Sequence, residues 1–254
     1  MTKSAVTHAL ILAAGRGERM RPLTDTTPKP LLRAGGKRLI EWQIEALVRS
    51  GVREIVINVA HLPDQFSAAL GDGSRYGVTL RYSREGENAD DALESLGGIV
   101  KALRWLGDDP FIVTSGDIVT DYPYDLHQAS QMQQRGDTDA HLVLVENPPF
   151  HPRGDMGLTD RWIDPDATPR MTYANIGVFS PRLFSEVART FDGARAALFP
   201  WLYEAARARR ISGEVYYGRW WNAGTPDDLA HLDAKLMLVS SPTSSSQVDS
   251  DRLV

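Results

Sequence analysis

The residues best suited to chemistry form a loop near the start of the chain, at residues 15–29. Gly15 and Gly17 let backbone N–H groups come close to anionic oxygens, and Arg19 and Lys29 add positive charge. An apolar run at residues 9–14 precedes the loop and is typical of a buried strand. These residues predict a binding site for a nucleoside triphosphate, whose negative charge the two cations would neutralise.

Two common phosphate-binding loops do not fit this segment. The dinucleotide fingerprint needs a third glycine where Met20 stands, and the P-loop needs a Gly-Lys-Ser/Thr sequence that the chain lacks. The loop instead resembles the signature G-x-G-x-R-M-x-P-L-T-x-x-x-P-K of the nucleotide-diphosphate-sugar pyrophosphorylases, a family of nucleotidyltransferases. The resemblance covers nearly the whole chain. It implies that Arg19 holds the triphosphate and pyrophosphate and that Lys29 binds the α-phosphate, whereas we expect Arg16 and Arg21 to face solvent.

A candidate metal site involves Asp117, which follows an apolar stretch at residues 110–115. Strands of a parallel sheet bind ligands beyond their carboxyl ends, so we expect Asp117 to lie near the glycine loop. The resemblance implies that Asp117 binds Mg²⁺. It also implies a second ligand at Asn222, where the family segment W-x-D-x-G-T has aspartate. An amide oxygen can bind Mg²⁺ but adds no charge, so a weakened site or a helix cap remains an alternative for Asn222.

The nucleobase is expected between two backbone segments. Leu12, Ala13 and Ala14 end the first strand, and Gly97 and Gly98 lie in residues 92–99, which resemble a base-facing motif of the family. Uracil has one donor, N3–H, between two acceptors, and backbone groups could match that pattern in a gap too narrow for a purine. The two glycines also suit a helix start, and the sequence does not decide between uracil, thymine and guanine.

Candidate sugar contacts lie in the second half of the chain. Asn175 stands in a stretch that resembles the family's N-x-G, whose asparagine contacts the hexose, and it would be costly to bury without a partner. A loop at residues 146–158 resembles the branch of N-acetylmuramate 1-phosphate uridylyltransferases of peptidoglycan recycling. The resemblance implies that Arg153, Gly154 and Asp155 in this loop, together with Ser115, contact the sugar.

The lysines depart from the pattern of glucose-type relatives. The chain has five lysines, and residues 139–180 contain none, although those relatives place a second lysine on the sugar phosphate there. Either Arg153 or another arginine takes this role, or Lys29 and the metal act alone. Arg153 could instead pair with the lactyl carboxylate that muramic acid carries, or face water.

Composition excludes several functional classes. The net charge is −5, so no basic surface predicts binding to nucleic acid or to a membrane. There are no cysteines, which excludes disulfides and thiolate sites and favours the cytoplasm. The N-terminal residues show no cleavage site, and no apolar run approaches the ~20 residues of a membrane helix.

Strand and helix patterns alternate through the first half, which predicts an α/β fold with parallel strands. Strands are expected at residues 9–14, 54–60, 78–83 and 110–115, with helices between them. We therefore expect a Rossmann-like, mostly parallel sheet with helices on both faces and a small β-rich sugar-binding lobe at 139–180. Residues 1–239 would form a single domain, and the Ser-rich residues 240–254 a tail.

The resemblance as a whole implies a cytoplasmic, Mg²⁺-dependent enzyme that joins UTP and N-acetylmuramic acid 1-phosphate. A glucose 1-phosphate thymidylyltransferase or a mannose 1-phosphate guanylyltransferase is an alternative within the same class. A non-catalytic nucleotide-sugar sensor is an alternative of another class, motivated by Asn222 and disfavoured by the presence of Arg19, Lys29 and Asp117 together. Monomer and weak homodimer are both compatible with the sequence.

Overall fold

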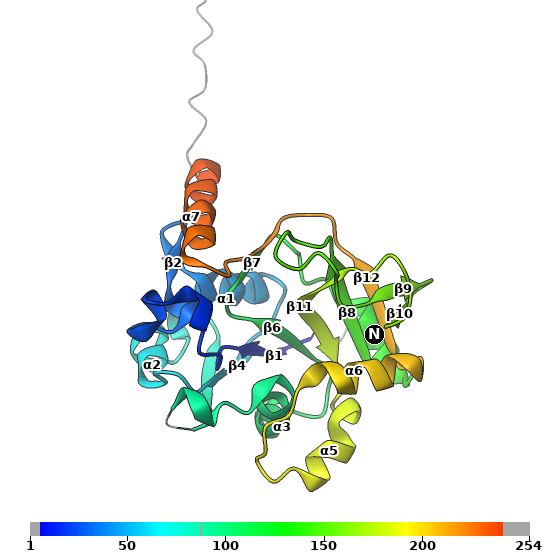
Figure 1. Ribbon diagram of the computed structural model, residues 1–254. Coiled ribbons are helices and arrows are strands. Elements are labelled where there is room, and N and C mark those ends of the chain that lie inside the picture. The colour runs from blue at the N-terminus through cyan, green and yellow to red at the C-terminus, as the bar shows by residue number, and fades with distance from the viewer. Residues whose placement is uncertain (1–5, 87, 241–254) are drawn as a thin grey trace, which may run out of the picture.

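The polypeptide alternates strands and helices through its first half and adds further strands in its second half, as Figure 1 shows. The computed structural model describes residues 6–86 and 88–240. Its helices are α1 Leu39–Arg49, α2 Asp64–Leu70, α3 Glu94–Leu106, α4 His127–Arg135, α5 Ser185–Thr190, α6 Leu198–Arg207 and α7 Pro226–Ser240. Its strands are β1 His8–Leu12, β2 Arg33–Ala34, β3 Lys37–Arg38, β4 Glu54–Val59, β5 Thr79–Arg84, β6 Phe111–Ser115, β7 Ile118–Thr120, β8 Ala140–Val145, β9 Gly157–Thr159, β10 Trp162–Asp164, β11 Thr172–Phe179, β12 Ile211–Val215 and β13 Trp220–Asn222. Short 3-10 turns occupy Glu18–Met20, Leu23–Asp25, Lys29–Leu31, Ser74–Tyr76, Ala89–Asp91 and Pro181–Phe184.

Over the described residues, nine strands form one sheet in the order β5-β4-β1-β6-β11-β8-β12-β10-β9. The strands β5, β4, β1 and β6 run parallel, with Leu10 of β1 opposite Val56 of β4 and Val113 of β6. β11 pairs antiparallel with β6 and with β8. The expected α/β fold is confirmed, with a parallel first half and mixed strands beyond β6. The carboxyl ends of the four parallel strands lie along one edge, where such sheets bind ligands.

Helices cover both faces of this sheet. On one face, apolar side chains of α1, α2 and α4 pack on alternate strand residues such as Ala9 and Ile11. On the other face, α3 and α6 pack on Leu10 and its neighbours, and Figure 1 shows α3, α5 and α6 grouped on one side of the strands. Because β1 and β4 are covered on both faces, both are largely apolar runs in the sequence.

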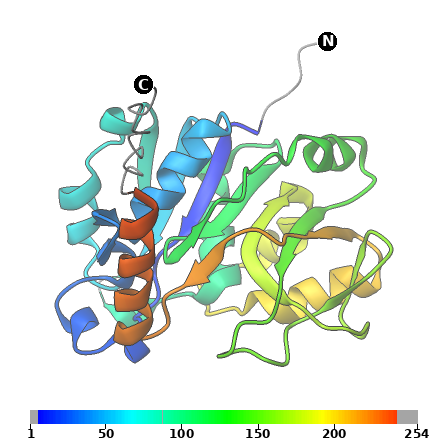
Figure 2. The same ribbon diagram turned by 90° about the horizontal axis from the view of Figure 1, so that it is seen from above.

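The helix α7 packs on a separate apolar cluster that includes Met20 and Val119. Figure 2 shows β13 between α7 and the main sheet; β13 pairs with β7, and Asn222 lies opposite Ile118. Thr225 Oγ1 accepts a hydrogen bond from Asp228 N–H at 3.2 Å, and the Asp228 carboxylate accepts one from Thr225 N–H at 2.9 Å. This reciprocal cap starts α7, and so fixes the chain just after Asn222.

The strands expected in a sugar lobe at residues 139–180 belong to the main sheet. β8 pairs with β11 and β12, and β11 continues the pairing to β6. That residues 1–239 form one domain stays a prediction. The expected tail, apart from residue 240 at the end of α7, lies outside the described residues. Within the residues described, no helix has both the length and the apolar character needed to cross a bilayer.

Candidate active site

The loop after β1 is held by short-range contacts. Gly17 has a φ of 69°, a left-handed conformation that favours glycine. Its carbonyl accepts hydrogen bonds from Met20 N–H at 2.9 Å and from the Thr24 hydroxyl at 2.9 Å. Met20 is fully buried and anchors the loop to the cluster under α7. The backbone amides of the loop are thereby fixed in their directions.

A cleft of about 1140 Å³ lies over the carboxyl ends of β1, β4, β5 and β6. Among the residues predicted to bind the nucleotide, those that line the cleft are Leu12, Ala13, Ala14, Gly15, Gly17 and Lys29. Among those predicted to bind the metal and the sugar, the lining includes Asp117, Ser115 and Asn175. Residues at the ends of the parallel strands β1 and β6 therefore meet in one cavity, as parallel strand topology predicts, and the antiparallel strand β11 adds Asn175.

Lys29 is the centre of the charged part of the cleft. Its ammonium donates to Asp117 Oδ2 at 2.5 Å and to Asn222 Oδ1 at 3.2 Å. Asp117 stands in the turn between β6 and β7, and Asn222 ends β13. The Lys29 side chain is only 11% exposed, so water and salt screen this ion pair weakly. Three distant segments of the chain thus place one cation and two oxygens at the same point.

The two oxygens on Lys29 are the kind of ligand that Mg²⁺ prefers, a carboxylate and an amide carbonyl. They come from different elements, and both accept hydrogen bonds from the Lys29 ammonium, so the position between them accommodates a positive charge. No cluster of three or more His, Cys, Asp or Glu side chains occurs in the part of the chain that the structure describes. Asp117 and Asn222 supply two oxygens that would suit a magnesium ion, and phosphate oxygens and water would have to complete its coordination.

Arg16 and Arg21 both line the cleft; Arg21 faces solvent as expected, with 55% of its side chain exposed, whereas the Arg16 side chain is 28% exposed. Arg16 Nη1 lies 3.0 Å from His61 Nδ1 and 2.8 Å from His61 Nε2, and Nε2 lies 2.7 Å from the Thr24 carbonyl oxygen. Arg16 also donates to the Thr24 carbonyl at 3.5 Å and to the Asp25 carboxylate at 3.4 Å. The buried His61 is therefore one of the groups that orient Arg16. The only sequence signal for His61 is its position just after a buried strand.

Arg19 does not line the cleft in this structure, although the resemblance implies that it should. Its side chain is exposed, and its guanidinium lies beside Gly224, where an added Cβ would be 3.6 Å from Arg19 Nη1. The turn that buries Met20 directs the preceding side chain outward. Arg19 can therefore reach a phosphate in the cleft only through a change of rotamer.

Gly97 and Gly98 are also placed differently from the expectation, because both are buried in α3 and do not line the cleft. The Gly97 N–H group lies 3.3 Å from the Ala196 carbonyl, to which it donates. A Cβ on Gly98 would lie 2.4 Å from Glu85 Oε1, so Gly98 makes room for that carboxylate. The part of this segment that lines the cleft consists of Ala92, Glu94 and Ser95.

Asn175 reaches the cleft because β11 is irregular. The pairing of β11 with β8 shifts between Tyr173 and Gly177, and Asn175 has a left-handed φ of 54°. Such a bulge redirects a side chain relative to its neighbours. Asn175 is half-buried in the cleft lining rather than enclosed in the apolar strand, which explains a polar residue at this position.

The loop residues predicted to bind the sugar do not line the cleft. Asp155 accepts from Tyr173 N–H at 2.8 Å, and its other oxygen lies 2.9 Å from His151 Nε2, so it ties the loop to β11. Gly154 is buried with a φ of 58°, and Arg153 is exposed. Gly154 and Asp155 therefore shape the loop, and neither touches the cavity.

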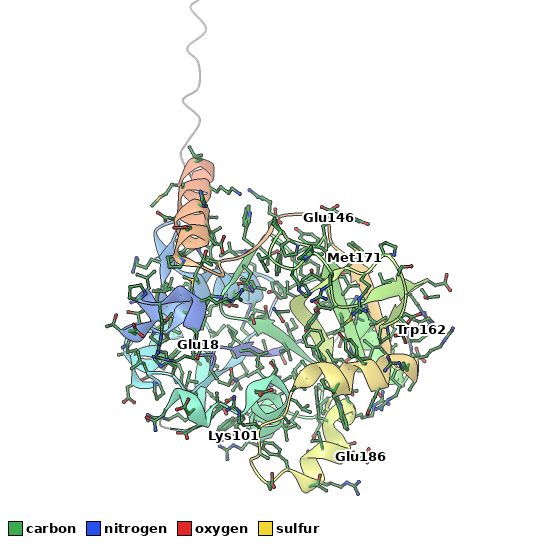
Figure 3. The ribbon with its side chains drawn as sticks, in the orientation of Figure 1. Glu18, Lys101, Glu146, Trp162, Met171 and Glu186 are labelled. Atoms are coloured by element: carbon green, nitrogen blue, oxygen red, sulfur yellow. The ribbon has the colours of Figure 1, made fainter. Side chains whose placement is uncertain are left out.

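Asn222 also borders a second cavity of about 610 Å³, between residues 145–150, residues 216–218 and α7. Glu146 lines this cavity, and in Figure 3 it lies at the upper right of the molecule, whereas Glu18 of the glycine loop lies at the left. Trp220 and Trp221 line the same cavity. The charged cluster around Lys29 thus stands where the two cavities approach each other.

Comparisons with known proteins agree with this arrangement. A family model described as "Nucleotidyl transferase" matches residues 8–157. The N-acetylmuramate alpha-1-phosphate uridylyltransferase of Neisseria meningitidis serogroup B is 45% identical over 222 residues, covering 85% of this chain and 93% of that protein. The protein of the same name from Caulobacter vibrioides is 31% identical over 237 residues, covering 90% and 96%. The inositol-1-phosphate CTP transferase of T. maritima has a TM-score of 0.74 at 19% identity, covering 93% of this chain and 96% of that one, which supports the fold.

Proposed function

The chain belongs to the nucleotidyl transferase family, and from that premise we propose that it joins UTP to N-acetylmuramic acid 1-phosphate, giving UDP-N-acetylmuramic acid and pyrophosphate. The general reaction, nucleotidyl transfer to a sugar 1-phosphate, follows from the family. The particular substrates are supported by two relatives named for them, each matched over at least 85% of this chain. In this role the protein would serve peptidoglycan recycling in the cytoplasm.

The observation that carries the proposal is the meeting of Lys29, Asp117 and Asn222 in a cleft lined by a glycine loop. In the reaction, a phosphate oxygen of the sugar 1-phosphate forms a bond to the α-phosphorus of UTP. The bond from that phosphorus to the bridging oxygen of the β-phosphate breaks, and pyrophosphate leaves with the electron pair. No protein nucleophile is needed, so catalysis consists of positioning and charge stabilisation.

The catalytic residues would divide this work between them. Lys29 would move from Asp117 to the α-phosphate, where it stabilises the charge that develops on the equatorial oxygens. Asp117 and Asn222 would hold Mg²⁺, which when bound neutralises phosphate charge. The amides of Gly15 and Gly17 would bind the triphosphate.

Three arginines would assist with the leaving pyrophosphate. Arg16 and Arg21 already line the cleft, and Arg19 would join them after a change of rotamer. A guanidinium can bind two phosphate oxygens at once through its planar fork. The nucleobase would lie between residues 12–14 at the end of β1 and the cleft-lining residues at the start of α3. The sugar would lie between Asn175 and the second cavity beside Asn222.

A pyrophosphate-release assay tests the proposal. The purified protein is mixed with Mg²⁺ and each of UTP, dTTP, GTP and CTP, combined with the 1-phosphates of N-acetylmuramic acid, N-acetylglucosamine, glucose and mannose. We expect the highest kcat/KM for UTP with N-acetylmuramic acid 1-phosphate. A higher value for dTTP with glucose 1-phosphate, or for GTP with mannose 1-phosphate, would transfer the assignment to that enzyme. Binding of nucleotide without release for any pair would indicate a sensor.

Arg153 provides a separate test of sugar recognition. We propose that it pairs with the lactyl carboxylate of the muramic acid group, which N-acetylglucosamine lacks. Arg153 is an exposed cation in the loop at residues 146–158, and residues 146–150 of this loop line the second cavity, beside which the sugar is proposed to lie. Arg153→Ala should then reduce the preference for the muramic acid substrate. An unchanged ratio of kcat/KM for the two sugar 1-phosphates would rule this role out.

A further inference from the structure

Two buried polar side chains connect the walls of the cleft where the base is proposed to lie. Ala13 N–H donates to Asn58 Oδ1 at 2.7 Å, and Asn58 Nδ2 donates to Glu85 Oε1 at 2.6 Å. Leu93 N–H donates to Glu85 Oε2 at 2.7 Å. Asn58 is 3% exposed and Glu85 7% exposed, and both line the cleft. A continuous chain of three hydrogen bonds thus runs from Ala13, just after β1, to Leu93, just before α3.

The direction of every hydrogen bond in this chain is fixed by its ends, because Ala13 and Leu93 both present backbone N–H donors. The amide of Asn58 must turn its oxygen toward Ala13, which leaves its NH₂ group facing Glu85. Glu85 must then accept with both of its oxygens. An ionised carboxylate accepts at both oxygens, whereas a side-chain amide accepts at one and donates at the other. With asparagine at position 58, the chain therefore requires a carboxylate at position 85.

The surrounding packing is built for this carboxylate. A Cβ on Gly98 of α3 would lie 2.4 Å from Glu85 Oε1 and 2.6 Å from Asn58 Nδ2, so only glycine leaves the two groups room. Lys101, which Figure 3 shows on α3, has its ammonium 3.5 Å from the Glu85 carbonyl oxygen. Burial raises the pKa of Glu85, and the hydrogen bonds from Leu93 and Asn58 act in the opposite direction. The same bonds that complete the chain thus favour the ionised form.

Ala13 belongs to one wall of the cleft, and Leu93 lies between Ala92 and Glu94 of the other wall. We propose that Asn58 and Glu85 set the distance between these walls, and that this distance admits a pyrimidine base and excludes a purine. The inference rests on the proposed function and extends it to base selection. Asn58 and Glu85 act through the backbone of Ala13 and Leu93, so they are positioning residues.

Exchanging the two side chains tests the proposal. Glu85→Gln sets an NH₂ group against the Asn58 NH₂ group or the Leu93 N–H, and Asn58→Asp sets two carboxylates against each other. The double variant Asn58→Asp/Glu85→Gln restores all three hydrogen bonds with the middle one reversed. Affinities for UTP and GTP are measured by titration calorimetry, which needs no sugar substrate. We expect each single variant to lower the preference for UTP over GTP about tenfold, and the double variant to recover it within about threefold.

A matched control separates base selection from general stability. Glu41 is another buried glutamate, which accepts from Arg38 N–H at 2.8 Å and pairs with Arg75 at 3.0 Å, and it does not line the cleft. Glu41→Gln should lower the melting temperature and leave the preference for UTP over GTP unchanged. If that control changes the preference as much as Glu85→Gln does, the effect is general loosening and the proposal is overturned.

Each other outcome of these measurements also supports or overturns the proposal. Single variants that keep the preference of the unmodified protein overturn the proposal, and so does a double variant that recovers its melting temperature without the preference. If a single variant does not fold, a folded double variant with the original preference supports the proposal, and one without it refutes it. An unmodified protein that binds no nucleoside triphosphate would refute both this inference and the proposed function. Selective UTP binding without pyrophosphate release would refute only the reaction.

Discussion

Replacing Lys29 by methionine removes the ammonium and keeps most of the apolar stem. The substitution deletes the hydrogen bonds of 2.5 Å to Asp117 and 3.2 Å to Asn222, and it leaves a carboxylate without its cation beside the incoming phosphates. Groups that stabilise developing charge contribute about 10²–10³ in rate, or about 2.7–4 kcal/mol, and we expect kcat/KM to fall by that factor. The free energy of unfolding should fall by no more than about 1.5–3 kcal/mol, since the Asp117 side chain can turn to water in the cleft.

The assay is the initial rate of pyrophosphate release by Lys29→Met, Asp117→Asn and the double variant, with thermal unfolding measured in parallel. If the two side chains act on the substrates separately, the double variant loses at least as much activity as either single variant. A double variant that regains activity would refute the reasoning, because the ammonium would then serve only to neutralise Asp117. Lys37→Met is the control: Lys37 lies 3.8 Å from the centroid of the Trp42 ring and does not line the cleft, so kcat/KM should stay within about twofold.

Four further results are expected. Gly15→Ala should raise the Kd for UTP about tenfold, because the added Cβ would meet a bound phosphate. The melting temperature should not change, because no protein atom lies within 4 Å of that Cβ. An unchanged Kd would mean that the phosphates bind elsewhere. His61→Ala should raise the KM for UTP about threefold to tenfold and change kcat less, since Arg16 loses one of the groups that orient it. A loss confined to kcat would contradict this role. Burial lowers the pKa of His141 below its ordinary 6.5, against the effect of the nearby Glu214 carboxylate, so the unfolded chain binds the proton more tightly and the free energy of unfolding should fall as the pH drops below 6.5. In urea unfolding, His141→Gln should lose less of this free energy than the unmodified protein, by up to about 1.4 kcal/mol per pH unit. An identical loss in both proteins would exclude His141 as the cause. Chelation of divalent cations by EDTA should abolish pyrophosphate release and added Mg²⁺ should restore it, whereas full activity in EDTA would exclude the proposed metal site.

The α/β fold could be predicted from the sequence because its signals are local. Buried parallel strands are continuous apolar runs, and the reciprocal cap of Thr225 and Asp228 lies within four residues of chain. The edge at which the glycine loop and Asp117 meet also follows from strand order, without any knowledge of side chains. The pairing of β11 with β6, which attaches the strands of the expected lobe to the main sheet, joins strands distant in the chain and has no local signal in the sequence.

The sequence did not predict the direction in which individual side chains point. Arg16, Arg19 and Arg21 are neighbours in one loop, and burial of Met20 in the tertiary structure turned Arg19 away from the cleft that the other two line. Gly97 and Gly98 resembled a base-binding motif, yet packing against Glu85 and Ala196 accounts for them.

The sequence by itself therefore determined the order of strands and helices, the glycine loop and the identity of the charged groups available to it. Only the tertiary structure decided that Lys29 meets Asn222 across 193 residues of chain, and that Asn58 and Glu85 join the two walls of the cleft. The physical reason is that secondary structure depends on the periodicity of neighbouring residues, whereas hydrogen bonds between buried side chains depend on how separate elements pack.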